Sequence, residues 1–305
     1  MEVYLKDNLM NEAPNTCVYW SYLEGKCDSL DMVFDDSEGA IKALELKKGD
    51  VAQVTDEFID TGNMYISGID YNGTQAAIRA LSLPLSAFKT KTQQWNNATM
   101  TAVIQDALKG LSLKVVFIDK PNFIYMDVAM IESEPLKFLS GKLALEGYGV
   151  RVNNDTVYIF DEAALEKGDY KEQYTEESFQ DAPKYSTKDA KLVSEIENTY
   201  TAADGTLICT SEKSGIEGKI IRLNMPVASV GESIRFSKGM MRAANKFEYV
   251  AEAGIEGLTR IPGDIVYLAD APIGHNGENL IYMIKNDIAN NKQTLYMRRP
   301  IEGDY

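Results

Sequence analysis

The chain has 305 residues, 45% of them hydrophobic, and its 31 basic and 46 acidic side chains give a formal net charge of −15. It is long enough for two or three domains with cores of their own. Its basic residues form no cluster that could neutralise phosphates, so specific nucleic-acid binding is disfavoured. No apolar run reaches the roughly 20 residues of a membrane span, and no leader pattern opens the chain, so we expect no membrane insertion and folding in the cytoplasm.

Residues 1–85 have the composition of β structure. Valine, tyrosine, tryptophan, methionine and phenylalanine are dense over 16–23 and 30–34, and further strand-like arms follow at 65–69 and 76–81. Polar turns separate these arms. We therefore expect the first segment to form a small antiparallel sheet that is rolled into a barrel.

Helical periodicity begins in the next segment, residues 86–165. Apolar residues recur at helical spacing after Asn97 and Thr99, either of which could cap the helix. Two strands follow, and a second helix is expected after Ser133, with a proline in its first turn. Asn154-Asp155 then predicts the turn of a hairpin. This segment is expected to be an α+β domain.

The rest of the chain returns to β structure. Residues 166–190 are polar, acidic and rich in tyrosine, which is typical of an exposed linker between domains. Residues 191–305 contain several strand-like runs and one helix near 232–246. We expect this last segment to form a second β domain that carries one helix.

An internal repeat links the first and last thirds. Residues 49–56 read Gly-Asp-Val-Ala-Gln-Val-Thr-Asp and return as Gly-Asp-Ile-Val-Tyr-Leu-Ala-Asp at 263–270. A polar loop, a glycine, an apolar run and a strand-like arm follow in each copy, at an offset that drifts only from 214 to 218 residues. The predicted fold class is thus α+β but mainly β, with two similar antiparallel β-barrel domains and an α+β domain inserted between them. Three such chains would offer six similar modules around one axis.

Motifs for catalysis, cofactors or metals are missing from the sequence. His275 is the single histidine and lies in a polar loop, where a solvated side chain is expected. The chain contains no phosphate-binding glycine loop and no Gly-Xaa-Ser-Xaa-Gly, and among 46 acidic residues a pair of carboxylates carries no information. Cys17, Cys27 and Cys209 are expected to be buried or half-buried free thiols. We therefore predict a protein that is not an enzyme and holds no cofactor.

Five short segments, taken in order, carry a resemblance to a known family. They are Trp-Asn-Asn-Ala-Thr at 95–99, Gly-Leu at 110–111, Asp-Lys-Pro at 119–121, Ile-Glu-Ser-Glu-Pro-Leu-Lys-Phe-Leu at 131–139 and Pro-Gly-Asp-Ile-Val at 262–266. This ordered set resembles the baseplate hub proteins of contractile phage tails, the late-control protein D family. The resemblance covers roughly residues 40–300 and is strongest over 90–165.

The resemblance implies a trimeric hub at the centre of a phage tail or a tail-like injection particle. Each subunit of such a hub supplies two tube-protein-like barrels, so the trimer imitates a hexameric ring and joins the tail tube protein to a trimeric spike. Other baseplate or LysM-type tail proteins and the tape measure protein are further implied partners. The chain has no room for a fused spike or lysozyme domain, so a separate spike chain is expected. The implied location is a virion baseplate or an extracellular tail-like particle, assembled in the bacterial cytoplasm.

The loops after Asp56 and Asp270 hold equivalent places in the two copies, and we expect them to face equivalent partners. The candidate interface residues are Glu57, Phe58, Asp60, Pro272, His275 and Asn276. Two other functions stay open at this point. One is a tail-tip protein that binds cell-wall polysaccharide through exposed aromatic side chains of residues 170–200, and the other is a peptidoglycan hydrolase.

Overall fold

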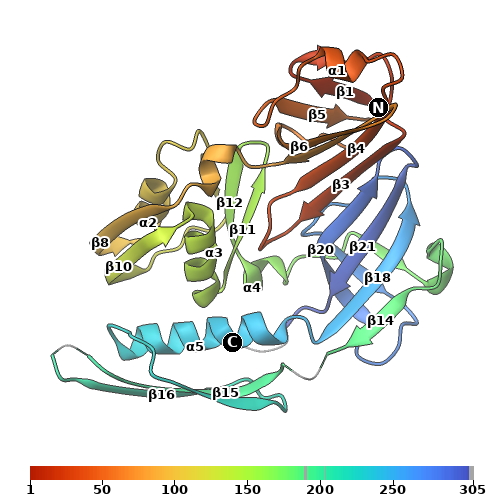
Figure 1. Ribbon diagram of the computed structural model, residues 1–305. Helices are drawn as coiled ribbons and strands as arrows, with labels where there is room; N and C mark the ends of the chain where they lie inside the picture. Colours follow the sequence, from red (N-terminus) through yellow and green to blue (C-terminus); the bar gives the residue numbers. More distant parts are fainter. Residues whose placement is uncertain (189–190, 203, 302–305) are drawn as a thin grey trace.

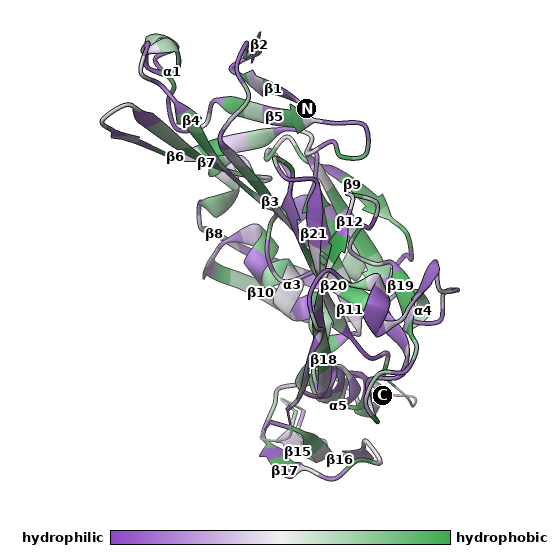
Figure 2. Ribbon diagram, turned by 90° about the vertical axis from the view of Figure 1, so that its right-hand side faces the viewer, coloured by the Kyte–Doolittle hydropathy of each residue, from purple (hydrophilic) through white to green (hydrophobic). Residues whose placement is uncertain are grey.

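The computed structural model of the protein describes residues 1–188, 191–202 and 204–301. The fold is α+β and mainly β, as the sequence predicts: within these residues, one 13-stranded sheet is accompanied by three sheets of two or three strands. Figure 1 shows the large sheet on one side, with the first short helix at its top, and the other helices and the smaller sheets beside and beneath it. In Figure 2, turned by 90°, the molecule is elongated, with the N-terminal strands at one end and the sheet of residues 193–223 at the other.

The first module packs one part of the large sheet around its own core. Strands β3 and β4 alternate buried with partly exposed residues, as strands with one face on a core do. Leu30, Met32 and Phe34 of β4 point into this core. The elements of the module are β1 (Glu2–Leu5), β2 (Asn8–Leu9), β3 (Thr16–Tyr22), β4 (Ser29–Asp35), α1 (Ala40–Ala43), β5 (Val51–Thr55), β6 (Met64–Asn72) and β7 (Gln75–Leu81).

The second module forms the rest of the large sheet around a separate core, to which Val266, Ile284 and Leu295 belong. Its elements are β13 (Glu172–Tyr174), η2 (Glu176–Ser178), β14 (Lys184–Thr187), β18 (Tyr249–Glu256), β19 (Ile265–Leu268), β20 (Gly277–Asp287) and β21 (Lys292–Arg298). Here the structure differs from the expected exposed linker, because residues 166–190 contribute two strands and bury Tyr174. Strands of three or four residues are too short to leave a period in a polar sequence.

The repeat seen in the sequence is confirmed in the strand pairing. The order β5–β6–β7–β4–β3 in the first module corresponds to β19–β20–β21–β18–β14 in the second. The backbone N–H of Gly49 donates to the Ile66 carbonyl at 2.8 Å, and Gly263 donates to Ile281 at the same distance. Both glycines have positive φ, 94° and 100°, which the turn before β5 and β19 requires. Both long strands also carry a bulge at the same place, after Ile66 and after Ile281.

The two modules are joined in one continuous sheet, although the middle region lies between them in the sequence. The joining strands are β20 and β3, which pair antiparallel over five residues on each side, from Met283 opposite Tyr22 to Asp287 opposite Val18. Segments more than 260 residues apart in the chain therefore lie side by side (Figure 1).

The middle region forms two small sheets with helices packed on them. The Thr99 hydroxyl accepts a hydrogen bond from the Ala102 N–H at 3.2 Å, so Thr99 caps the first helix and Asn97 belongs to the strand before it. Pro135 occupies the first turn of the second helix, as predicted. The elements are η1 (Leu85–Phe88), β8 (Lys91–Thr99), α2 (Met100–Ala107), β9 (Lys114–Phe117), β10 (Ile124–Ser133), α3 (Pro135–Leu145), β11 (Tyr148–Asn153), β12 (Thr156–Asp161) and α4 (Glu162–Leu165).

A further unit is inserted between β14 and β18, and it packs on the middle region. It consists of β15 (Val193–Thr201), β16 (Leu207–Lys213), β17 (Lys219–Leu223) and α5 (Val230–Asn245). Helix α5 lies between this sheet and α3 (Figure 1), and Phe236 joins the core of the middle region. Gly239 permits the approach, since a Cβ there would lie 2.3 Å from the Leu145 carbonyl oxygen. The predicted division into 1–85, 86–165, 166–190 and 191–305 stays a prediction.

Candidate partner interface

Three of the six predicted interface residues lie on the loop between β5 and β6. Glu57, Phe58 and Asp60 are exposed there, and Phe58 is 56% exposed. Hydrogen bonds fix the loop, because the Asp60 carboxylate accepts from the Gln53 amide at 2.9 Å and from the Gly62 N–H at 2.8 Å. A phenyl ring is thus presented to solvent from a fixed backbone.

The other three lie on the loop between β19 and β20, where the structure departs from the sequence. Pro272 and Asn276 are exposed, but His275, which was expected to be solvated, is only 3% exposed. Its ring lies against Tyr185 and Tyr249, with ring centroids 5.1 and 5.5 Å away. Burial lowers the pKa of His275. The cause of the burial is a tight turn in which the His275 N–H donates to the Pro272 carbonyl at 2.9 Å, so the ring folds back onto the sheet.

The two loops lie in different surroundings although their sequences are equivalent. The first runs into the hairpin of the middle region, where the side chains of Asn63 and Tyr65 donate to the Asp155 carboxylate at 2.8 and 2.7 Å. Gly62 makes this approach possible, since a Cβ there would lie 2.4 Å from that of Asn154. The second loop packs on β14 and β18 of its own module. That the two loops meet equivalent partners stays a prediction.

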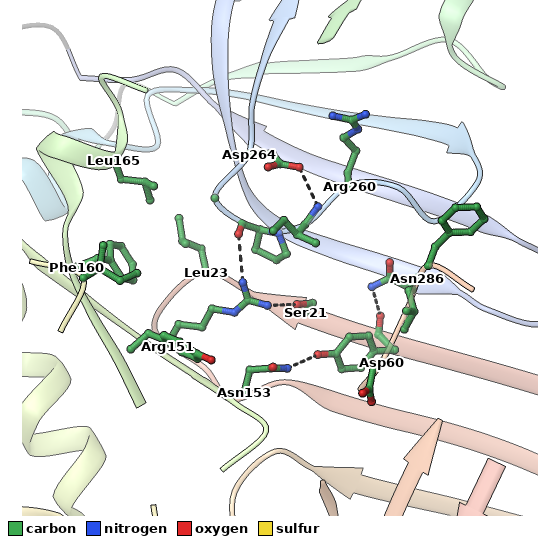
Figure 3. Close-up of a pocket in the computed structure, with 18 residues that line it drawn as sticks. Ser21, Leu23, Asp60, Arg151, Asn153, Phe160, Leu165, Arg260, Asp264 and Asn286 are labelled. Atoms are coloured by element: carbon green, nitrogen blue, oxygen red, sulfur yellow. Dashed lines mark hydrogen bonds between the residues drawn. The ribbon is translucent and has the colours of Figure 1, made fainter. Parts of the chain in front are cut away.

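A cavity of about 500 Å³ opens beside the first loop (Figure 3). Three exposed apolar residues line it, Phe58, Ile118 and Ile261, and each comes from a different part of the chain. Clustered exposed apolar residues mark a surface that binds a partner. The other lining residues labelled in the figure are Ser21, Leu23, Asp60, Arg151, Asn153, Phe160, Leu165, Arg260, Asp264 and Asn286.

Sequence reasoning finds only Phe58 and Asp60 of this cavity. Ile118 and Ile261 are followed by Asp119 and Pro262, which are typical turn residues. An isoleucine next to a turn is the one sequence signal that could have indicated their exposure. The lining segments lie far apart in the sequence, so the sequence does not show that they are neighbours in the structure. The joined sheet brings the loops of Phe58 and Ile261 together, and the middle region adds Ile118, which follows β9.

A buried hydrogen-bond network underlies the cavity, with Asp28 at its centre. This carboxylate is fully buried and accepts from the Tyr19 hydroxyl at 2.5 Å and from the Tyr22 N–H at 2.8 Å. Burial raises the pKa of Asp28, against the opposing effect of the Arg151 guanidinium 3.9 Å away. Arg151 also donates to the Pro262 carbonyl at 3.2 Å, as Figure 3 shows. The network therefore ties the first module, the middle hairpin and the loop before β19 together.

A second buried network holds the second module to the middle region, and it consists of charges. Its members are Glu24, Glu162, Glu166, Arg242, Lys246 and Arg298. Burial works to raise the pKa of Glu162, but Lys246, 3.1 Å away, and the neighbouring arginines lower it to about 2. Lys246 also pairs with Glu24 of the first module. The acidic side chains of this cluster therefore lie against its cations with little access to water.

The cavity carries exposed apolar side chains at its surface and is lined within by buried residues of both kinds, apolar Leu23 and Phe160 and polar Ser21 and Asn286. Among the residues that the structure describes, no group of three or more His, Cys, Asp or Glu side chains could hold a metal ion. No helix of this part is long and apolar enough to cross a bilayer. The three cysteines are free, with Cys17 buried and Cys27 half-buried as expected, but Cys209 is exposed.

The aromatic residues expected to mark a polysaccharide-binding face are mostly withdrawn from solvent. Tyr170 is 48% exposed and its ring centroid lies 5.6 Å from that of Tyr267. Tyr174, in contrast, belongs to the core of the second module, and Tyr185 is half-buried beside His275. This arrangement gives the polysaccharide-binding alternative no support.

No family model and no curated protein sequence matches the chain. Solved structures match it over almost its whole length, and the fold is one that tail proteins of prophages have. The 43 kDa tail protein of prophage MuSo2 from Shewanella oneidensis aligns with a TM-score of 0.76 at 15% identity, over 99% of this chain and 100% of that one. A tail protein from Neisseria meningitidis MC58 aligns with a TM-score of 0.77 at 10% identity, over 98% and 95%.

The fold also extends to a secretion system. The E. coli c3393 protein, a component of the type VI secretion system that is similar in structure to the T4 bacteriophage tail proteins gp27 and gp5, aligns with a TM-score of 0.63. The identity is 10%, and the match covers 100% of this chain and 78% of that one. These likenesses establish the fold of the chain as that of phage tail proteins.

Proposed function

We propose that the chain is a structural subunit of the baseplate hub in a contractile phage tail or a tail-like injection particle. In this proposal three chains form a ring whose six β modules imitate a hexamer. The observation that carries it is the repeat itself, since two modules with one strand order lie side by side in one sheet. A ring of three such chains presents six similar units to a sixfold partner. The fold shared with solved tail proteins supports a place in a tail.

The proposed partners are the tail tube protein on one face of the ring and a separate trimeric spike on the other. The described similarity of the E. coli secretion component to gp27 and gp5 motivates this assignment. Other baseplate or LysM-type tail proteins and the tape measure protein are further candidates. The exposed loop residues Glu57, Phe58, Asp60, Pro272 and Asn276 are the proposed contacts, with His275 supporting the second loop from within.

The mechanism is one of assembly geometry and not of turnover. A ring that imitates six units requires the two modules of each chain to keep one fixed orientation. The network around Asp28 and the charge cluster around Glu162 supply that rigidity, because both are buried and both join different parts of the chain. No step of this function requires a cofactor.

Native mass spectrometry and light scattering on the purified full chain test the proposal. We expect a particle of three chains of 33.9 kDa each and, in negative-stain averages, a ring with six similar densities. A chain that stays monomeric at every concentration, with and without its tail tube protein, would contradict the hub assignment. Turnover of peptidoglycan by the purified protein would contradict the non-enzymatic role.

A further inference from the structure

The junction between the two modules defines how one module meets the next. Along the second half of β20, each residue pairs with one residue of β3, and Ile284 and Asn286 are buried in this stretch. The Leu23 N–H donates to the Tyr282 carbonyl and the Ile288 N–H to the Cys17 carbonyl, both at 2.9 Å. These two bonds bracket the pairing and fix which pairs between them are hydrogen-bonded.

The first module has the same long strand, but its second half has no partner. Strand β6 pairs with β5 only through its first two residues, Met64 and Tyr65. Beyond them, in the part of the chain that the structure describes, residues 68–72 pair with β7 on one side alone. Asp70, Tyr71 and Asn72 are exposed, and Tyr71 is 48% exposed. In the second module, β20 is the counterpart of β6, and β3 covers the corresponding edge of β20.

The second module also carries the counterpart of β3, and that strand is open as well. Strand β14 stands at the end of the large sheet and, among the described strands, pairs only with β18. Tyr185 of β14 corresponds to Tyr19 of β3, because each is reached through the same succession of strand partners. The successions are Ile66, Ala80, Leu30 and Tyr19 in the first module and Ile281, Met297, Ala251 and Tyr185 in the second.

We propose that β6 of one copy pairs antiparallel with β14 of a second copy, which repeats between chains the β20–β3 junction found within the chain. This inference rests on the proposed ring and names its subunit interface. Transferring the register of the inner junction gives four residue pairs. They are Ile69 with Thr187, Asp70 with Ser186, Tyr71 with Tyr185 and Asn72 with Lys184.

The hydrogen-bonding directions of the two open edges agree with this register. The Lys188 N–H donates to the Glu248 carbonyl at 2.7 Å, so by alternation Ser186 bonds to β18 while Tyr185 and Thr187 turn their backbone groups outward. A two-residue turn joins β6 to β7, so Asn72 and Asp70 bond to β7, and Ile69 and Tyr71 turn outward. In the proposed register, Ile69 therefore faces Thr187 and Tyr71 faces Tyr185, so both hydrogen-bonded pairs join residues whose backbone groups turn outward.

The side chains also suit one another. The register places the Tyr71 and Tyr185 rings opposite each other, and aromatic cross-strand pairs stabilise sheets. Asp70 lies diagonally across from Lys184 and Lys188, both exposed, so an acidic edge meets a basic one. Each copy offers one β6 edge and one β14 edge, which makes the contact head-to-tail and allows a ring to close. Pairing these two open edges with each other also protects both of them from aggregation through exposed edge strands.

A disulfide across the interface tests the register. The proposed Asp70–Ser186 pair corresponds to Lys285–Trp20, which lies between hydrogen-bonded pairs, and such a pair holds its side chains close enough to be bridged. In a background with the exposed Cys209 replaced by serine, Asp70→Cys with Ser186→Cys should oxidise to species of two and three chain masses and none larger. The control, Asp70→Cys with Tyr185→Cys, moves one thiol to the other face of the strand and should not cross-link.

A second variant separates the interface from the fold. Thr187→Pro removes an outward N–H and leaves the bonds to β18 in place, so the chain should fold with unchanged helix and strand content while its trimer is lost. Native mass measures the trimer independently of the cysteines. Suppose that the wild-type chain forms a trimer. If the matched cysteines of the double variant then stay reduced, or if Thr187→Pro still forms the trimer, the strand pairing is overturned and the hub proposal is kept. A wild-type chain without any trimer would overturn both.

Discussion

The two β modules keep one strand order but are anchored to the middle region in different ways. In the first module, the buried Asp28 carboxylate accepts a hydrogen bond from the Asn153 amide of the middle hairpin at 3.3 Å and lies 3.9 Å from the Arg151 guanidinium. Asn63 and Tyr65 add hydrogen bonds to Asp155 of the same hairpin. The second module is held by a cluster of buried ion pairs that includes Arg298. What the modules share is therefore backbone geometry, set by Gly49 and Gly263 and by a bulge at one place. Their attachment depends on side chains that the repeat does not contain.

The largest effect on stability is expected when a residue of the second module is replaced by its counterpart in the first. At the end of the last strand the repeat has Leu81 in one copy and the fully buried Arg298 in the other. Arg298→Leu leaves the Glu166 carboxylate buried without that partner, so we expect the free energy of unfolding to fall by about 3–5 kcal/mol. Urea unfolding measures the loss. Arg79→Leu, at the exposed pair with Asp31, is the control and should cost less than about 0.5 kcal/mol.

Equal losses in Arg298→Leu and its control would contradict the view that the charge cluster holds the second module. A loss confined to the cluster variant would support that view. Hydrogen exchange adds spatial resolution, because the β18–β21 ladder should lose protection first.

The next largest effect is expected in the first module, at Asp28→Asn. An amide can still accept from the Tyr22 N–H, but it leaves Arg151 without the carboxylate that faces it. We expect a loss of about 2 kcal/mol in the free energy of unfolding, smaller than in the charge cluster, because a single buried polar group is disturbed. Asp31→Asn, on the exposed side of β4, is the matched control. A loss larger than that of Arg298→Leu would reverse the ranking of the two anchors.

The acidity of the charge cluster gives a third test. Burial, and then the charge of Glu162, raises the pKa of Glu24 from 4.5 to about 7, although Lys246 opposes this. A carboxyl group whose pKa is higher in the folded state binds more protons there, so stability falls as pH rises from about 4.5 to about 7. Glu162, whose pKa is lowered to about 2, acts in the other window and loses its contribution as pH falls from about 4.5 to about 2.

Unfolding free energies measured at several pH values resolve these two windows. The wild-type chain should lose about 2 kcal/mol between pH 5 and 8 through Glu24, and Glu24→Gln should remove most of that slope. Glu57→Gln, on the exposed loop of the first module, should leave the slope unchanged. A Glu24→Gln variant with the wild-type slope would show that this group is ionised throughout.

The fold class and the repeat could be read from the sequence because both depend on local patterns. Glycine and aspartate at 49–50 and 263–264 specify a turn, and alternation in β3 and β4 specifies strands with one buried face. Thr99 and Pro135 mark helix starts for equally local reasons. Such signals need no knowledge of what lies across the core.

Features that depend on distant pairing could not be read in this way. The joining of β20 to β3, the strands within 166–190 and the cavity all arise between segments far apart in the chain. His275 illustrates the limit at a single residue: its loop composition predicts solvent, but one turn places the ring between two tyrosines of the sheet. Sequence equivalence of the two loops therefore did not predict equal exposure.

The smallest effect on stability, and the sharpest test of the loops, is expected at Phe58→Ser. This ring is exposed on a loop fixed by Asp60, so the free energy of unfolding should change by less than about 0.5 kcal/mol. Binding of an apolar dye to the patch with Ile118 and Ile261 should fall clearly, and Asn276→Ser on the other loop should alter neither quantity. If the two loops met equivalent partners, both variants would weaken attachment to a purified tail tube protein or spike to the same degree. The first loop carries an exposed aromatic ring beside a cavity, so we expect Phe58→Ser to weaken this attachment more than Asn276→Ser does. Equal weakening by the two variants would support the equivalent roles of the loops that the sequence predicts.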